Sequence, residues 1–142
     1  HPGEWIRPKL LRQTHRLWFG KEFHPIRDER SNMVGESAGT IAYMPPEQIR
    51  NFRDVRPQSD IYAVGMTAYN LMAGQIALSL PPKPNMAATI KSIFEEPTIP
   101  LKQRAPLVPP AVCEIIDRAL TKDPTQRWQS AAAMRTALLH AA

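Results

Sequence analysis

The sequence predicts a mainly α-helical fold, and three observations support this prediction. Apolar residues recur at steps of three and four over residues 61–72 and 112–120, which is the spacing of helices. Most of the fifteen prolines lie at the expected starts of helices or between them. No run of alternating strands precedes the first helix. With 142 residues and 43% hydrophobic content, the chain can form one core but not two sizeable domains.

Proline and capping residues mark the first two expected helices. A short helix begins at Pro46, where a missing N–H is tolerated. After a loop through Pro57, Ser59 is the expected N-cap of a central helix that ends at Gly74. Both faces of this helix are apolar, and it carries almost no charge after Asp60. We therefore expect it to be buried on nearly every side.

Loops and helices are expected to alternate over the remaining chain. An extended, proline-rich linker leads to Asn85, the expected cap of a helix through about Phe94, and residues 95–110 are expected to form a loop. One more helix lies between the prolines at 110 and 124, and Ser130 caps the last helix. Residues 1–34 carry no clean period and are expected to be irregular.

Charge and composition exclude some classes of function. Eighteen basic and thirteen acidic residues give a formal charge of +5, and seven of the basic residues fall within the first 30 positions. These charges alternate with acids, whereas nucleic-acid binding requires a basic stripe on one face interleaved with exposed aromatics. No nucleic-acid partner is therefore expected.

The single cysteine and the apolar runs bear on location. Cys113 can form neither an internal disulfide nor a Cys-based zinc site, which suits a reducing compartment. Its apolar neighbours predict a buried residue on a helix. No apolar run reaches the ~20 residues of a membrane span, and no signal-peptide pattern opens the chain. We expect a soluble, cytoplasmic chain without a membrane segment.

Three motifs in a fixed order carry the functional information. They read Gly-Thr-Ile-Ala-Tyr-Met-Pro-Pro-Glu over 39–47, Ser-Asp-Ile-Tyr-Ala-Val-Gly over 59–65 and Asp-Pro-Thr-Gln-Arg over 123–127. In this order they resemble the substrate-facing loop with its Ala-Pro-Glu ending, the central helix and the Arg-bearing turn of a protein kinase. The chain is similar to Ser/Thr protein kinases of the bacterial receptor-like type, in the C-terminal lobe from around the Asp-Phe-Gly region to the last helix.

This resemblance implies a fold and a division of the chain. The fold would be the helical large lobe of the protein-kinase-like fold with the N-terminal β lobe absent, because no Gly-rich phosphate loop is found. Residues 1–34 would be a degenerate remnant of the catalytic and metal loops with the start of the activation segment. Residues 35–142 would be the kinase C-lobe, with the end of that segment and the helices.

The resemblance also assigns residues to the substrate side. Gly39, Thr40 and Tyr43 would lie in the substrate-facing, or P+1, loop. Thr40 matches the threonine that contacts the catalytic Asp of Ser/Thr kinases and helps to select a hydroxyl-bearing substrate; alternatively, it is a turn residue after Gly39. Ser31 and Ser37 are possible phosphorylation sites, because a phosphate there could order the activation segment by pairing with arginines.

The structural motifs of the family are matched by Pro46, Glu47, Asp60, Gly65 and Arg127. Glu47 and Arg127 would form the buried ion pair that ties the activation segment to the helical core. Asp60 would hydrogen-bond the backbone of the catalytic loop, interact with the dipole at the start of its helix, or do both. The usual Trp and Ser of the central motif are replaced at positions 62 and 63, while Gly65 is retained.

The residues that would perform phosphoryl transfer cannot be assigned. This reaction requires an Asp that orients the hydroxyl, an Asp and an Asn that hold Mg²⁺, and a Lys on the ATP phosphates. Trp18 stands where the metal-binding Asp of Asp-Phe-Gly is expected, and an indole cannot coordinate Mg²⁺. We therefore expect neither a catalytic residue nor a metal site in this chain.

The main interpretation is that the chain is the C-lobe portion of a Ser/Thr protein kinase. The intact form would use ATP and Mg²⁺ to phosphorylate protein Ser/Thr hydroxyls. It would also contain an N-terminal kinase lobe and engage a protein substrate or docking partner. The chain alone is expected to be inactive and to bind no cofactor. The alternative, favoured by Trp18, is a pseudokinase-like interaction or scaffold module without catalysis.

Overall fold

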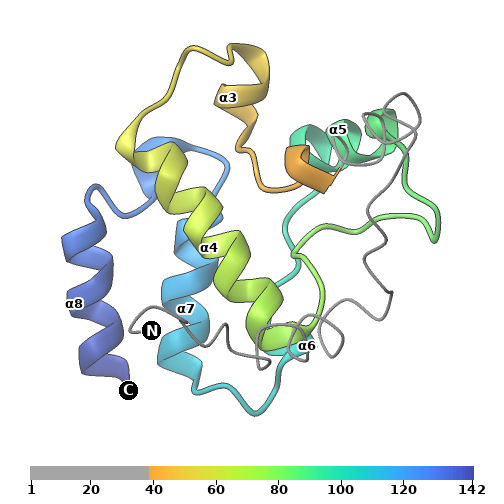
Figure 1. Ribbon diagram of the computed structural model, residues 1–142. Coiled ribbons are helices and arrows are strands. Elements are labelled where there is room, and N and C mark those ends of the chain that lie inside the picture. The colour runs from red at the N-terminus through yellow and green to blue at the C-terminus, as the bar shows by residue number, and fades with distance from the viewer. Residues whose placement is uncertain (1–38) are drawn as a thin grey trace, which may run out of the picture.

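The computed structural model describes residues 39–142, and this part of the chain contains helices and no strand. The predicted mainly α fold is therefore confirmed. The helices in chain order are α3 (Pro46–Arg50), α4 (Pro57–Ala73), α5 (Met86–Glu95), α6 (Leu101–Arg104), α7 (Pro110–Ala119), the 3-10 helix η1 (Pro124–Gln126) and α8 (Ala131–Ala141) (Figure 1).

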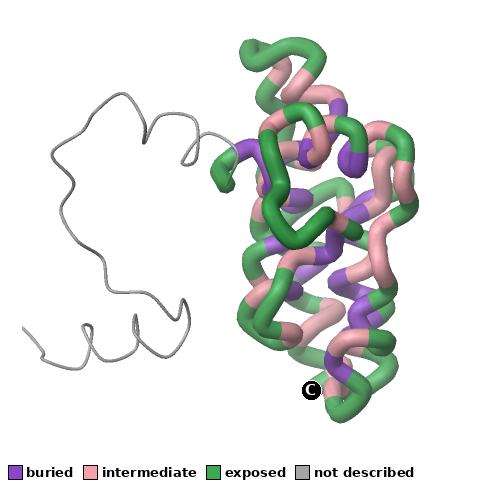
Figure 2. Tube along the Cα trace, turned by 90° about the vertical axis from the view of Figure 1, so that its right-hand side faces the viewer, coloured by how far each residue is buried: buried purple, intermediate pink, exposed green. Residues whose placement is uncertain are grey.

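The core lies where α7 packs against α4, α6 and α8. Figure 2 shows the buried residues inside the helical bundle and the exposed ones around it. The helices α4 and α7 supply eight of the seventeen buried hydrophobic core residues of the described chain, among them Met66, Tyr69 and Ile116. Cys113 is buried on α7, as predicted. None of the described helices is both long and apolar enough to cross a bilayer.

Two predicted helix caps are confirmed. The Asn85 side chain accepts a hydrogen bond from the backbone N–H of Ala88 at 2.8 Å, at the start of α5. The Ser130 hydroxyl oxygen accepts one from the N–H of Ala133 at 3.1 Å, at the start of α8. The predicted end of α4 is also confirmed: Gly74 follows the helix with a φ of 71°, in the left-handed region that favours glycine.

Replacing either cap should destabilise the protein. We expect Asn85→Ala and Ser130→Ala each to lower the free energy of unfolding by about 1 kcal/mol, because each leaves an N–H of the first helical turn without its acceptor. Urea unfolding measures the effect. Ser79→Ala is the matched control, since Ser79 is exposed in the linker. Cap variants as stable as this control would contradict the capping role.

The predicted start of the central helix was wrong. The N-cap of α4 is Arg56, and Pro57 is its first residue, so the helix begins before Ser59. The reason is that proline is pre-organised for the first helical position, where no N–H is needed. Ser59 is buried inside the first turn, and its hydroxyl donates to the Glu47 carboxylate at 3.1 Å instead of capping the helix.

The expectation that α4 is buried on nearly every side was also wrong. Among the described residues, Val64, Leu71 and Met72 are exposed by 56%, 57% and 41%. The buried face, which includes Tyr62 and Met66, is the one that packs on α7 and the neighbouring elements. An apolar sequence alone does not tell how many sides of a helix are covered.

The loop predicted over residues 95–110 contains a helix, α6, so this expectation needs correction. The four residues of α6 are too few to show a helical period. Leu101 is fully buried, and its backbone N–H donates to the Asp117 carboxylate at 3.0 Å. Burial raises the pKa of Asp117, and this hydrogen bond opposes the rise only in part. The side chain of Asp117 thus holds α6 against α7.

Candidate functional site

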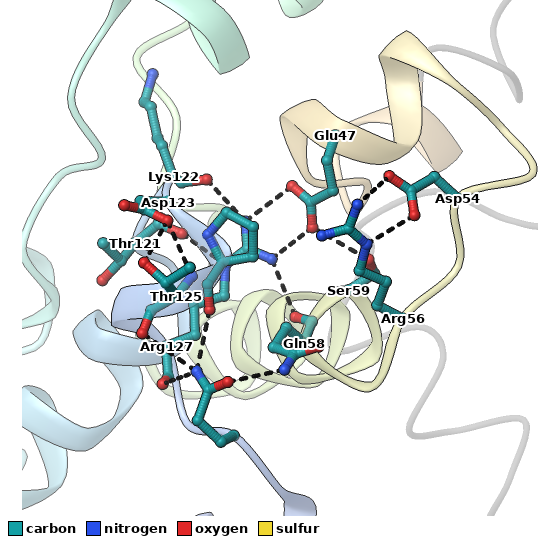
Figure 3. Close-up of polar contacts among 12 residues, drawn as sticks. Glu47, Asp54, Arg56, Gln58, Ser59, Thr121, Lys122, Asp123, Thr125 and Arg127 are labelled. Carbon is teal, nitrogen blue, oxygen red and sulfur yellow. Dashed lines mark hydrogen bonds and ion pairs between the residues drawn. The ribbon is translucent and has the colours of Figure 1, made fainter.

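Glu47 on α3 and Arg127 after η1 form an ion pair across 80 residues of sequence. The Arg127 Nη1 donates to Glu47 Oε1 at 2.6 Å, and its Nη2 donates to Oε2 at 3.0 Å (Figure 3). The Arg127 side chain is fully buried, and that of Glu47 is only 12% exposed. The pair expected from the sequence is therefore present, with the two-pronged geometry that favours arginine over lysine.

Every N–H of the Arg127 guanidinium has an acceptor. Besides Glu47, it donates to the backbone carbonyls of Gln58 at 3.0 Å, Thr121 at 2.6 Å and Lys122 at 3.0 Å. The guanidinium also lies over the Tyr62 ring, 5.0 Å from its centre. Burial raises the pKa of this tyrosine to about 12, although the Arg127 charge opposes the shift. A buried charge is tolerated when its hydrogen bonds are complete, as they are here.

Lys122 extends this network to α5. Its ammonium group donates to the carbonyls of Ser92 at 3.3 Å and Ile93 at 2.7 Å, in the last turn of that helix. Burial lowers the pKa of Lys122, while the charge of Glu96 raises it. Since the Lys122 carbonyl accepts from Arg127, one short turn holds both the ion pair and the end of α5.

The ion pair makes stability depend on pH. Burial alone would raise the pKa of Glu47, but the hydrogen bonds and charge of Arg127, with the Ser59 hydroxyl, hold it below the usual 4.5. A carboxylate with a lowered pKa stabilises the fold above its unfolded pKa, and this contribution is lost as the pH falls through the folded pKa. We expect the free energy of unfolding to fall in acid below pH 4.5. In Glu47→Gln the fall should be smaller, and urea unfolding over a pH series tests this; an equal fall would contradict it.

The segment of residues 39–44 is joined to α4 through Tyr43, whose hydroxyl accepts a hydrogen bond from the Asn70 side chain. The backbone N–H of Tyr43 donates to the Thr40 carbonyl at 3.1 Å, and that of Met44 to the Ile41 carbonyl at 2.9 Å, so the chain turns here. Ile41 is buried, whereas Gly39 and Thr40 are exposed. Two of the three residues predicted for the substrate side, Gly39 and Thr40, thus lie on the surface, and the third, Tyr43, is partly buried.

Two further predicted residues lie on α4. Asp60 is exposed in its first turn, a position compatible with the dipole interpretation. Gly65 faces α7: a Cβ built on it would lie 2.7 Å from the Cβ of Ala119. Glycine at this position is thus what allows the two helices to approach closely. Pro46 is the first residue of α3 and is buried.

An apolar groove of about 390 Å³ opens between α4 and α8. Asp60 and Arg135 are the charged residues among those that line it, and the others are apolar: Pro57, Ile61, Val64, Ala131, Met134, Leu138 and Leu139. A nucleoside triphosphate with Mg²⁺ needs several hard oxygen ligands and several donors for phosphate. The groove offers one carboxylate and one guanidinium, and no cluster of three metal-ligating residues occurs within residues 39–142. This groove therefore lacks the set of ligands and donors that Mg²⁺-ATP requires.

Several predicted positions lie outside the described residues. These are Trp18, the possible phosphorylation sites Ser31 and Ser37, and the boundary between residues 34 and 35. They stay predictions. Conversely, sequence reasoning missed Asn70, whose side chain contacts Tyr43. Its polar character within an apolar stretch of α4 was the available signal.

The helical lobe and the Glu47–Arg127 pair agree with the organisation that the motif order implied, the large lobe of a protein kinase. The family model for the protein kinase domain matches residues 24–139. The chain therefore belongs to the protein kinase family.

Similar curated proteins are bacterial Ser/Thr kinases. The chain is 35% identical over 109 residues to the serine/threonine-protein kinase PksC of Streptomyces coelicolor, an alignment that covers 77% of this chain and 19% of PksC. It is 37% identical over 106 residues to the kinase pkn3 of Myxococcus xanthus, covering 74% of this chain and 19% of the relative. The kinase PknB of Mycolicibacterium smegmatis is 32% identical over 117 residues, with 78% and 18% covered. The chain thus spans about a fifth of the length of these relatives.

Proposed function

We propose that this chain is the C-lobe portion of a Ser/Thr protein kinase whose intact form transfers the γ-phosphate of ATP to Ser or Thr hydroxyls of proteins. The observation that carries the proposal is the complete Glu47–Arg127 network, which anchors the segment over residues 39–47 to the helical core. The similarity to relatives that are named Ser/Thr kinases supports the same proposal. Since ATP is the donor, the proposed place of action is the cytoplasm.

The part that this portion would play is positioning. Phosphoryl transfer depends mainly on holding the acceptor hydroxyl in line with the phosphate and on neutralising charge. Thr40 and Tyr43 lie on the anchored segment and would face a protein substrate. Mg²⁺-ATP would be held elsewhere in the intact kinase, with an N-terminal lobe as the partner of this one. Because no Asp or Lys for that task can be assigned here, the chain alone would be inactive.

A first experiment tests the chain by itself. Thermal unfolding is followed with and without millimolar ATP and Mg²⁺, since a ligand that binds the folded state must raise its Tm. We expect no rise in Tm. A rise that requires Mg²⁺ would overturn the statement that the chain alone binds no Mg²⁺-ATP, and Glu4, Glu22 and Asp28 would be the next residues to replace.

A second experiment tests the proposed activity. The segment of the Streptomyces coelicolor kinase PksC that aligns with this chain is replaced by the residues of this chain, and phosphorylation of the chimera and of a protein substrate is measured. We expect phosphoryl transfer. Unmodified PksC is the positive control, and Arg127→Met in the chimera is the negative one.

The second candidate function is a pseudokinase-like scaffold, and Trp18 in place of the metal-binding Asp favours it. The chimera separates the two candidates if it is built twice, with the PksC metal-binding motif and with residues 18–20 of this chain. Phosphoryl transfer only by the chimera with the PksC motif would mean that the helical lobe of this chain supports catalysis, whereas its residues 18–20 do not. A folded chimera that binds ATP yet transfers no phosphate in either form would support the scaffold.

A further inference from the structure

A hydrogen bond between side chains joins the segment of residues 39–44 to the central helix. The Asn70 amide, on α4, donates through Nδ2 to the Tyr43 hydroxyl oxygen at 2.9 Å. The two residues are 27 positions apart in the sequence, and both are partly buried. The bond therefore connects this turn to α4, one of the helices that form the core.

The apolar contacts of this turn do not fix the orientation of the Tyr43 side chain. Ile41 and Ala42 are buried, but apolar burial is non-directional. The bonds from the N–H groups of Tyr43 and Met44 lie within the turn itself. The Tyr43 ring is only half-buried, so its orientation depends on what holds the hydroxyl. Among the contacts that the structure shows for this ring, the Asn70 amide supplies the directional one.

We propose that Asn70 is a positioning residue for the substrate-facing segment: by holding the Tyr43 hydroxyl, it fixes the turn of residues 40–44 on α4 in the geometry that a protein substrate meets. This inference rests on the proposed function. Asn70 acts through Tyr43 and is not itself a catalytic residue. A neutral hydrogen bond of this kind corresponds to about a 2- to 10-fold change in an equilibrium.

The chemistry of the pair suggests a conservative rescue. A tyrosine hydroxyl can donate as well as accept, and a carboxylate only accepts. Asn70→Asp is expected to keep the contact with the direction of the hydrogen bond reversed, whereas Asn70→Ala removes it. Thr67→Ala is the matched control on α4, because Thr67 is exposed and its hydroxyl donates only within the helix, to the Ala63 carbonyl at 2.9 Å.

The first test uses the chain as it is and does not depend on the kinase reaction. Hydrogen exchange is measured at the amides of Tyr43 and Met44 and at core amides of α4 and α7. We expect Asn70→Ala to speed exchange at the two turn amides about 2- to 10-fold without a matching change in the core. Asn70→Asp should restore protection, and Thr67→Ala should leave it unchanged. A uniform rise at all amides, or no rise at the turn, would overturn the proposal.

The second test uses the chimera with PksC. Asn70→Ala should raise KM for the protein substrate about 2- to 10-fold, with KM for ATP and kcat nearly unchanged, and Asn70→Asp should reverse the effect. If the chimera is active and Asn70→Ala leaves its KM for the protein substrate unchanged, the positioning role is overturned. A chimera that is inactive before any substitution counts against the proposed function alone, and the exchange measurement then decides on Asn70.

Discussion

Replacing Arg127 with methionine should lower the free energy of unfolding by about 3 to 5 kcal/mol, because it leaves Glu47 as a buried charge without its partner. The same substitution removes the donors to the Gln58, Thr121 and Lys122 carbonyls. Urea unfolding of the chain measures the loss. A variant that shows no cooperative unfolding transition at all would also agree with this prediction, because the loss would then exceed the stability of the chain.

Two companion variants separate the ion pair from the carbonyl contacts. Glu47→Leu combined with Arg127→Met removes both charges and should recover part of the stability, because an apolar pair can replace a buried ion pair at little cost. Recovery should be incomplete, since three carbonyls still lack a donor.

The control is the ion pair of Arg56 and Asp54, which lies on the surface with side chains 55% and 28% exposed. Its N–O distance of 2.7 Å is nearly as short as the 2.6 Å of the buried pair, yet solvent screens the surface pair. Arg56→Ala should therefore change stability little. If Arg127→Met proved no more harmful than Arg56→Ala, the Glu47–Arg127 network would not anchor the lobe as described.

This network also shows how far the sequence could predict the candidate site. The motifs indicated Glu47 and Arg127 as partners, and the structure shows them in contact. The carbonyl acceptors of Arg127 were not predictable, because every residue has a carbonyl and only the folded backbone decides which ones face a guanidinium. The contact of Asn70 with Tyr43 was not predicted for a related reason. It joins two segments whose relative position cannot be read from a local sequence pattern.

The sequence predicted a helix boundary correctly where a single capping residue determines it. Asn85 and Ser130 cap helices because a short polar side chain can reach a free N–H in the first turn. Ser59 is the same kind of residue, but Pro57 starts α4 earlier, and the Ser59 hydroxyl donates to the Glu47 carboxylate instead. Whether a serine caps a helix or serves a buried carboxylate depends on a partner 12 positions away.

Gly65→Val should be the second most damaging substitution, with a loss of about 3 kcal/mol in the free energy of unfolding. A Cβ at this position would lie 2.7 Å from the Ala119 Cβ and 3.4 Å from a methyl group of Leu120. The Ala119 Cβ is attached directly to the α7 backbone, so it cannot rotate away, and the two helices must separate. Gly65→Ala should destabilise less, because the gain in helix propensity, about 1 kcal/mol, offsets part of the clash.

A double-mutant cycle distinguishes this clash from a general loss of packing. Ala119→Gly removes the opposing methyl group, so combined with Gly65→Ala it should cost less than the sum of the two single changes. Gly39→Ala is the control, since a Cβ there meets nothing within 4 Å. Additive losses in the cycle would mean that the approach of α4 to α7 does not depend on Gly65. A coupling of the expected sign would instead show that the close packing of α4 on α7 depends on glycine at this position.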